Sequence, residues 1–149
     1  MITWIIKLMW ILLLSVIAWI DYKEQRIPNK ILTLGLILQF CLFAIQNKFN
    51  LPMLYQQQKH AIFVAGLYIC ILFGVFVTSK GAIGLGDVKL FGLLGYSWGI
   101  EKTMTILFLS FLLASVYIVL KFLFKREEEK KRISFAPFIW GSFLLCISF

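Results

Sequence analysis

Two of the seven acidic residues in this chain stand apart from the others. Asp21 and Asp87 each border a long apolar block, whereas the other five acids lie in exposed places or beside basic neighbours. An ionisable group at membrane depth is costly and usually serves a function. Taken singly, either carboxylate could be an ordinary helix-end residue that faces lipid headgroups and water. The residues around each aspartate are therefore needed to choose between these interpretations.

Short motifs surround both aspartates. Asp87 follows Gly84 and Gly86 in the run Gly-Leu-Gly-Asp, and glycines allow close approach of the backbone and conformations that other residues avoid. Asp21 begins a polar run that reaches Pro28 seven positions later. Two carboxylates, each at the end of an apolar block, predict a pair that could handle protons together.

This combination resembles the type IV prepilin peptidases, membrane aspartic proteases of the GxGD class, over most of the chain. The first family motif matches Asp21 with Ile27, Pro28 and Asn29. The second motif, GxGDxKL with trailing glycines, matches Gly84, Gly86, Asp87, Lys89, Leu90, Gly92 and Gly95. A weaker third match to Pro-Phe-Gly-Pro-Phe covers residues 134–138, where the first proline and the glycine are replaced but Pro137 is present.

The resemblance implies an aspartic endopeptidase with Asp21 and Asp87 as its catalytic residues. Its substrates would be pilin-like and pseudopilin precursors, which carry a basic leader followed by a hydrophobic helix. The sequence does not distinguish pilus, type II secretion, competence and flagellin-like systems. Water would be the nucleophile, with one carboxylate accepting its proton and the other donating to the scissile carbonyl. We therefore expect no metal and no cofactor. The matching positions also predict site-shaping or substrate-binding roles for Gly84, Gly86, Lys89, Pro28, Asn29 and Pro137.

One expectation follows from an insertion that the long family members carry and this chain lacks. Long members of the family carry a zinc-binding insertion between their first helices and also methylate the new N-terminus. Because Asp21 directly follows the first apolar block here, the chain resembles the short members, and we expect neither methyltransferase activity nor zinc.

The role of Lys89 stays open at this point. Its ammonium group could stabilise the ionised form of Asp87, contact the substrate backbone, or simply extend to the membrane surface.

The apolar blocks predict an all-α, polytopic membrane protein. Hydrophobic residues form 61% of the 149 positions, and the mean hydropathy is +0.91. We expect one transmembrane peptidase domain, residues 1–149, although the first block could instead be a secretory signal. Pro28 and Asn29 predict the start of the second helix, with Asn29 as its cap, and residues 46–60 predict a connecting loop with an interfacial stretch. Six helices are expected, at 2–20, 30–45, 61–78, 87–100, 103–124 and 133–149, the fourth and sixth short for a span.

The basic residues predict the orientation. The net charge of +8 is spread over short loops between apolar blocks, which favours a topology signal over nucleic-acid binding. Eleven Lys and Arg residues fall on the side of the first, third and fifth loops, and four fall on the other side: Lys7, Lys48, Lys59 and Lys102. The larger group predicts a cytoplasmic face that includes Asp21 and Asp87. Cys41, Cys70 and Cys146 stand singly in apolar segments and predict free thiols.

A different class of function stays open at this point. The chain could be a transport or assembly component of the membrane in which Asp21 and Asp87 bind a cation or a proton. A transport path should carry carboxylates in mid-span, yet the blocks at 30–45, 103–124 and 133–149 have no ionisable residue in their central stretches. The sequence therefore favours the protease. It makes no prediction of the oligomeric state.

Overall fold

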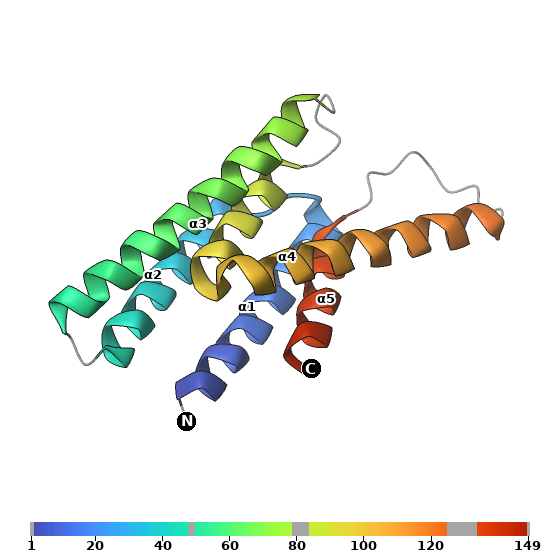
Figure 1. Ribbon diagram of the computed structural model, residues 1–149. Helices are drawn as coiled ribbons and strands as arrows, with labels where there is room; N and C mark the ends of the chain where they lie inside the picture. Colours follow the sequence, from blue (N-terminus) through green and yellow to red (C-terminus); the bar gives the residue numbers. More distant parts are fainter. Residues whose placement is uncertain (1, 48–49, 79–83, 125–133, 149) are drawn as a thin grey trace.

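The computed structural model describes residues 2–47, 50–78, 84–124 and 134–148, and all of the regular secondary structure in these residues is α-helical (Figure 1). Its five helices are α1 (Ile2–Glu24), α2 (Asn29–Gln46), α3 (Leu51–Thr78), α4 (Leu85–Leu123) and α5 (Ala136–Ser148). The first four are long and apolar enough to cross a membrane, whereas α5 is apolar but shorter. The predicted class, an all-α polytopic membrane protein, is therefore confirmed.

The number of helices differs from the prediction because α4 joins two expected spans, 87–100 and 103–124. The backbone inside α4 is not helical at Gly99, where φ is +76° and ψ is −175°. Only glycine adopts this region readily. The chain therefore changes direction without a loop, and Figure 1 shows the first arm (85–98, yellow) beside α3 and the second arm (100–123, orange) extending away from it.

Three helix boundaries also differ from the prediction. α1 continues to Glu24, so Asp21 lies inside its last turns, and Gln25 then ends the helix with a left-handed φ of 53°. α3 begins at Leu51, which makes most of the expected loop helical. Pro52 is tolerated there because the first-turn N–H groups have no partner within a helix. α5 begins at Ala136 instead of residue 133, and residue 133 lies outside the described residues.

The residue predicted to cap the second helix, Asn29, is not the cap residue. Pro28 occupies the cap position of α2, with φ −71° and ψ 125°, and no side chain caps the helix. The Pro28 carbonyl accepts the N–H of Ile31 at 3.1 Å. Asn29 is already the first residue of α2, which leaves its side chain available for a contact elsewhere.

The core lies where α1, the first arm of α4 and α5 meet. Trp10, Ile17, Leu94 and Phe143 are almost completely buried there. The Trp10 indole N–H donates to the side-chain carbonyl of the equally buried Gln39 at 3.0 Å, so both polar groups are satisfied. This bond joins α1 to α2 inside the core.

α3 packs closely on the first arm of α4. A Cβ added at Gly92 would lie 2.6 Å from Ile69 Cγ1, so the absence of a side chain allows this contact. The Tyr68 hydroxyl donates to the Ile100 carbonyl at 2.7 Å, just beyond the bend at Gly99. The bend is therefore held by α3 as well as by its own backbone.

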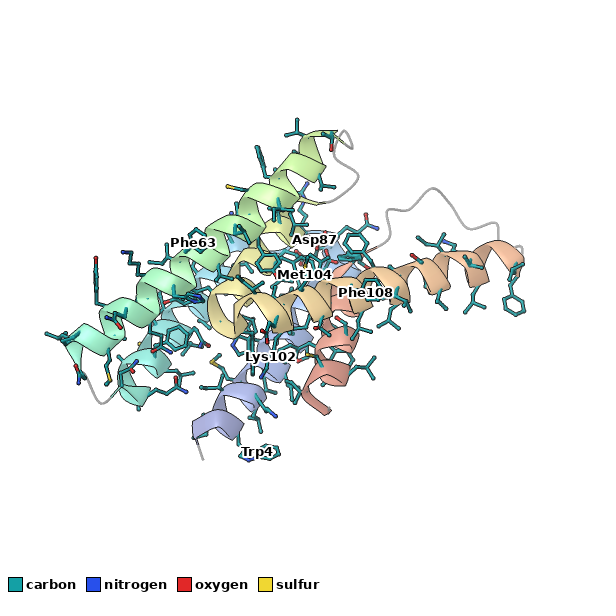
Figure 2. The ribbon with its side chains drawn as sticks, in the orientation of Figure 1. Trp4, Phe63, Asp87, Lys102, Met104 and Phe108 are labelled. Carbon is teal, nitrogen blue, oxygen red and sulfur yellow. The ribbon has the colours of Figure 1, made fainter. Side chains whose placement is uncertain are left out.

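The outer faces of the helices carry large exposed apolar side chains. Phe63 on α3 is 65% exposed and Phe108 on the second arm of α4 is 67% exposed (Figure 2). Such surfaces suit lipid rather than water. Cys41 and Cys70 are exposed and Cys146 is partly exposed, and all three thiols are free, as predicted. The basic positions Lys48, Lys80 and residues 125–132, with the acids Glu127, Glu128 and Glu129, lie outside the described residues.

Candidate active site

Asp21 and Asp87 line one cavity of about 810 Å³. The aspartates are only 7% and 9% exposed. The cavity walls come from the end of α1, the connection to α2, the start of α4, the second arm of α4 and the residues before α5. The fold therefore brings together the two carboxylates that the sequence singled out.

The start of α5 positions Asp21. One carboxylate oxygen of Asp21, Oδ2, accepts the backbone N–H of Ala136 at 3.2 Å. The first N–H groups of a helix have no partner within the helix, and its N-terminal end favours negative charge. Ala136 begins α5, so the carboxylate satisfies one of these groups. Pro137 lies in the same first turn of α5 and does not line the cavity.

A tight turn positions Asp87 at the start of α4. The N–H of Asp87 donates to the Gly84 carbonyl at 3.0 Å, and the N–H of Val88 donates to the same oxygen at 3.2 Å. A Cβ at Gly84 would lie 3.0 Å from the Asp87 carboxylate oxygen Oδ2. The missing side chain therefore leaves room for the carboxylate to fold back over the turn.

Gly86 brings the two motifs into direct contact. A Cβ at Gly86 would lie only 2.9 Å from the Cβ of Ile27, which belongs to the connection between α1 and α2. Real Cβ atoms do not approach so closely, so the connection can lie against α4 only because position 86 is glycine. This contact sets the distance between the chain segments that carry Asp21 and Asp87.

Lys89 and Asn29 form a second link between the motifs. The Lys89 Nζ donates to the Asn29 side-chain carbonyl at 3.1 Å, and both residues line the cavity. The Asn29 side chain makes this contact instead of capping α2. Pro28 is not among the lining residues, and its part is to begin α2.

The second arm of α4 supplies cavity residues that sequence reasoning missed. Phe111, Ala114, Ser115 and Ile118 line the cavity, at a spacing that places them on one helix face. Asp87 lies twelve residues before Gly99 and Phe111 twelve residues after it, about 18 Å along either arm. The equal distance of Asp87 and Phe111 from Gly99 could have indicated these residues in the sequence. That interpretation would have required knowing that the chain bends at Gly99.

The described residues include no group of three or more His, Cys, Asp or Glu side chains close enough to hold a metal ion. The cavity wall contains two basic side chains, Arg26 and Lys89, together with polar, apolar and small side chains. The cavity also offers a pair of carboxylates and one backbone N–H already bound to Asp21. Such a pair can exchange a proton with a water molecule and with a bound carbonyl group.

Comparison with protein-family models matches residues 8–119 to the type IV leader peptidase family. The chain belongs to this family. Family membership agrees with the resemblance drawn from the motifs, and it makes the chain a peptidase whose substrates are, in general, prepilin-like. None of the curated proteins and none of the solved structures compared with the chain matches it significantly.

The matched residues of this leader peptidase include both aspartates and end within the second arm of α4. Ala136, which binds Asp21, and Phe135, which lines the cavity, lie beyond the match. The sequence assigned residues 134–138 to a weak third motif, and the structure places part of that segment against the first motif. The third segment therefore completes the cavity from outside the matched region.

Proposed function

We propose that this leader peptidase is an aspartic endopeptidase in which Asp21 and Asp87 are the catalytic residues. The observation that supports it best is that two almost fully buried carboxylates, from motifs far apart in the sequence, line one cavity. Two ionised carboxylates that face each other repel, so the pair holds one proton between them. The pair then contains an acid and a base at once.

The reaction follows from this shared proton. The ionised carboxylate accepts a proton from a water molecule as the water oxygen attacks the scissile carbonyl carbon. The protonated carboxylate donates to the carbonyl oxygen, where negative charge develops. Collapse of the tetrahedral intermediate breaks the C–N bond, and a proton passes to the leaving amine. Since water is the nucleophile, the proposed reaction uses no covalent enzyme intermediate, metal or cofactor.

The proposed substrates are pilin-like and pseudopilin precursors, in which an apolar helix follows the cleaved bond. The second arm of α4 supports this assignment, because Ala114 and Ser115 are small side chains on the face that lines the cavity. Small residues let membrane helices approach closely. A substrate helix lying on this face would hold its preceding residues beside the aspartates.

The proposed orientation places the aspartates at the cytoplasmic face. It rests on the eleven basic residues that fall on their side of the membrane against four on the other. A basic leader would remain on this side for the same reason. The transport alternative has less support, because the aspartates lie at helix ends, not at mid-span, and because the family is one of peptidases.

The test is co-expression with candidate pilin-like precursors, with loss of the leader followed by mass. The parent should release the leader, whereas Asp21→Asn and Asp87→Asn should each reduce cleavage by at least a hundredfold, since neither side chain can then exchange the proton. Glu24→Gln is the matched control, because Glu24 is an exposed acid on the same helix and does not line the cavity.

Cleavage by either aspartate variant at the parent rate would refute the assignment. Equal amounts of each variant in the membrane fraction, and equal tryptophan fluorescence of the purified proteins, would exclude misfolding as the cause of a loss.

A further inference from the structure

A second cavity, of about 230 Å³, lies away from the aspartates. Lys7 of α1 and Trp98 and Lys102, on either side of the bend in α4, line it together with an apolar wall of Ile106, Phe143 and Ile147. Lys7 lies fourteen residues before Asp21 on α1, about 21 Å along the helix. Figure 2 likewise shows Lys102 far from Asp87. The two cavities therefore lie near opposite ends of the helices.

The polar groups of this cavity are strong hydrogen-bond donors. Lys7 and Lys102 supply ammonium groups, and the buried indole N–H of Trp98 has no acceptor among the described residues. Among the residues that the structure describes, no acidic side chain lines the cavity, and neither lysine forms an ion pair with any of them. A cavity with donors and without a carboxylate acceptor is suited to an anion.

Aromatic rings hold both ammonium groups near the cavity. Lys102 Nζ lies 5.0 Å from the centre of the Trp98 ring, and Lys7 Nζ lies 5.2 Å from the centre of the Trp4 ring. Contacts of this kind attract a cation but leave its hydrogen-bond donors free for another partner. The positive charges are therefore positioned and not neutralised.

The topology signal does not explain these lysines. Only four lysines fall on this side of the membrane, and positive charge here weakens the bias that orients the chain. Two of the four nevertheless converge on one cavity, although they come from different helices. The convergence of these two positive charges indicates a binding site for a ligand.

We propose that this cavity binds a phosphate group, with Lys7 and Lys102 contacting its oxygens and the Trp98 indole donating a further hydrogen bond. The cavity is smaller than the roughly 300 to 1,000 Å³ that encloses a whole drug-sized molecule, but its size suits a headgroup. The apolar wall beside the donors matches a phospholipid, whose chains would lie along α5 and the second arm of α4. Free phosphate offers the same chemistry from solution.

The binding test uses the purified full chain in a neutral detergent, with native mass spectrometry to measure bound lipid. Phosphatidylglycerol should bind the parent more tightly than diacylglycerol, which lacks the phosphate. Each lysine near a membrane surface contributes about fivefold, so Lys7→Gln with Lys102→Gln should weaken phosphatidylglycerol binding by roughly 25-fold. Trp98→Phe retains the ring and removes the donor, and should weaken binding by about two- to fivefold.

Lys59→Gln is the matched control, because Lys59 is an exposed lysine assigned to the same side and does not line the cavity. Its binding of phosphatidylglycerol should equal that of the parent. Lys102→Gln alone changes an exposed side chain and should still lose about fivefold, so the test does not depend on the double variant folding.

Titration with inorganic phosphate distinguishes the two sources. Retention of phosphatidylglycerol in millimolar phosphate would assign the site to a lipid headgroup, whereas its displacement, or binding of phosphate alone, would assign it to free phosphate. The proposal would be overturned if the double variant and Lys102→Gln bound phosphatidylglycerol as tightly as the parent. It would also be overturned if the parent bound phosphatidylglycerol and diacylglycerol equally. The outcome does not depend on whether the chain cleaves any precursor.

Discussion

At the scale of single residues, the candidate active site depends on glycines, whose lack of a side chain leaves room for neighbouring groups. Gly84 leaves room for the Asp87 carboxylate, and Gly86 leaves room for Ile27. Lys89 and Asn29 then join the same two chain segments by a hydrogen bond. The motif residues thus act on the relative position of the aspartates, and most of them need not touch a substrate to matter.

Gly86→Ala should reduce cleavage by about a hundredfold, because the new Cβ would lie 2.9 Å from the Ile27 Cβ and would push the two segments apart. The measurement is kcat/KM for precursor cleavage, alongside the melting temperature. Gly66→Ala is the control, since a Cβ at Gly66 meets no atom within 4 Å. Parent-like cleavage by Gly86→Ala would show that this contact does not position the aspartates.

At the scale of elements, α4 decides the shape of the cavity. Its first arm carries Asp87 and its second arm carries Phe111 and Ser115, so the bend at Gly99 determines whether both arms reach the same cavity. Its φ of +76° with ψ of −175° lies in a region that is essentially restricted to glycine.

Gly99→Ala should lower the free energy of unfolding by about 1 to 3 kcal/mol, purely through the backbone, since a Cβ at this position meets no atom within 4 Å. Gly99→Asn should be no better, because asparagine tolerates the left-handed helical region and not this one. Thermal unfolding in detergent gives the measurement. A Gly99→Ala protein as stable as the parent would contradict the backbone explanation.

Ser115→Leu should lower kcat/KM for a full precursor about tenfold, because it places a bulky side chain on the face proposed to receive the substrate helix. Val119→Leu is the control, since Val119 is 55% exposed on the same arm and does not line the cavity. Equal losses in the two variants would point to a general effect on the second arm and not to substrate docking.

At the scale of the whole molecule, charge and apolar surface act together. Four helices can cross a membrane, and the two cavities lie near opposite ends of α1. In the proposed orientation, the aspartates meet a leader in the cytoplasm while Lys7 and Lys102 face the other surface.

This orientation can be tested in intact cells with a membrane-impermeant thiol reagent. In a background that lacks Cys41, Cys70 and Cys146, Lys59→Cys should react before permeabilisation and Arg26→Cys only after it, since both positions are exposed on the protein. The opposite pattern would reverse the proposed topology. It would also move the aspartate cavity to the outer face.

The sequence by itself was enough to predict the helical membrane fold, the family, and Asp21 and Asp87 as candidates for the site. Apolar blocks of spanning length and short motifs are local features, and a reader of the sequence can see them without knowing the fold. Local signals were less successful at boundaries. The Asn29 cap was wrong, because the Asn29 side chain bonds Lys89 instead. The loop expected at 46–60 was too long, because α3 already begins at Leu51.

Only the tertiary structure decided which distant segments complete the cavity. The partnership of Asp21 with Ala136, and the arrival of the second arm of α4 beside Asp87, depend on the direction that the chain takes at Gly99 and on the packing of α5 against α1. The convergence of Lys7 and Lys102 has the same origin. Such contacts join residues far apart in the chain, and their geometry is set by the packing of whole helices, which no local pattern encodes.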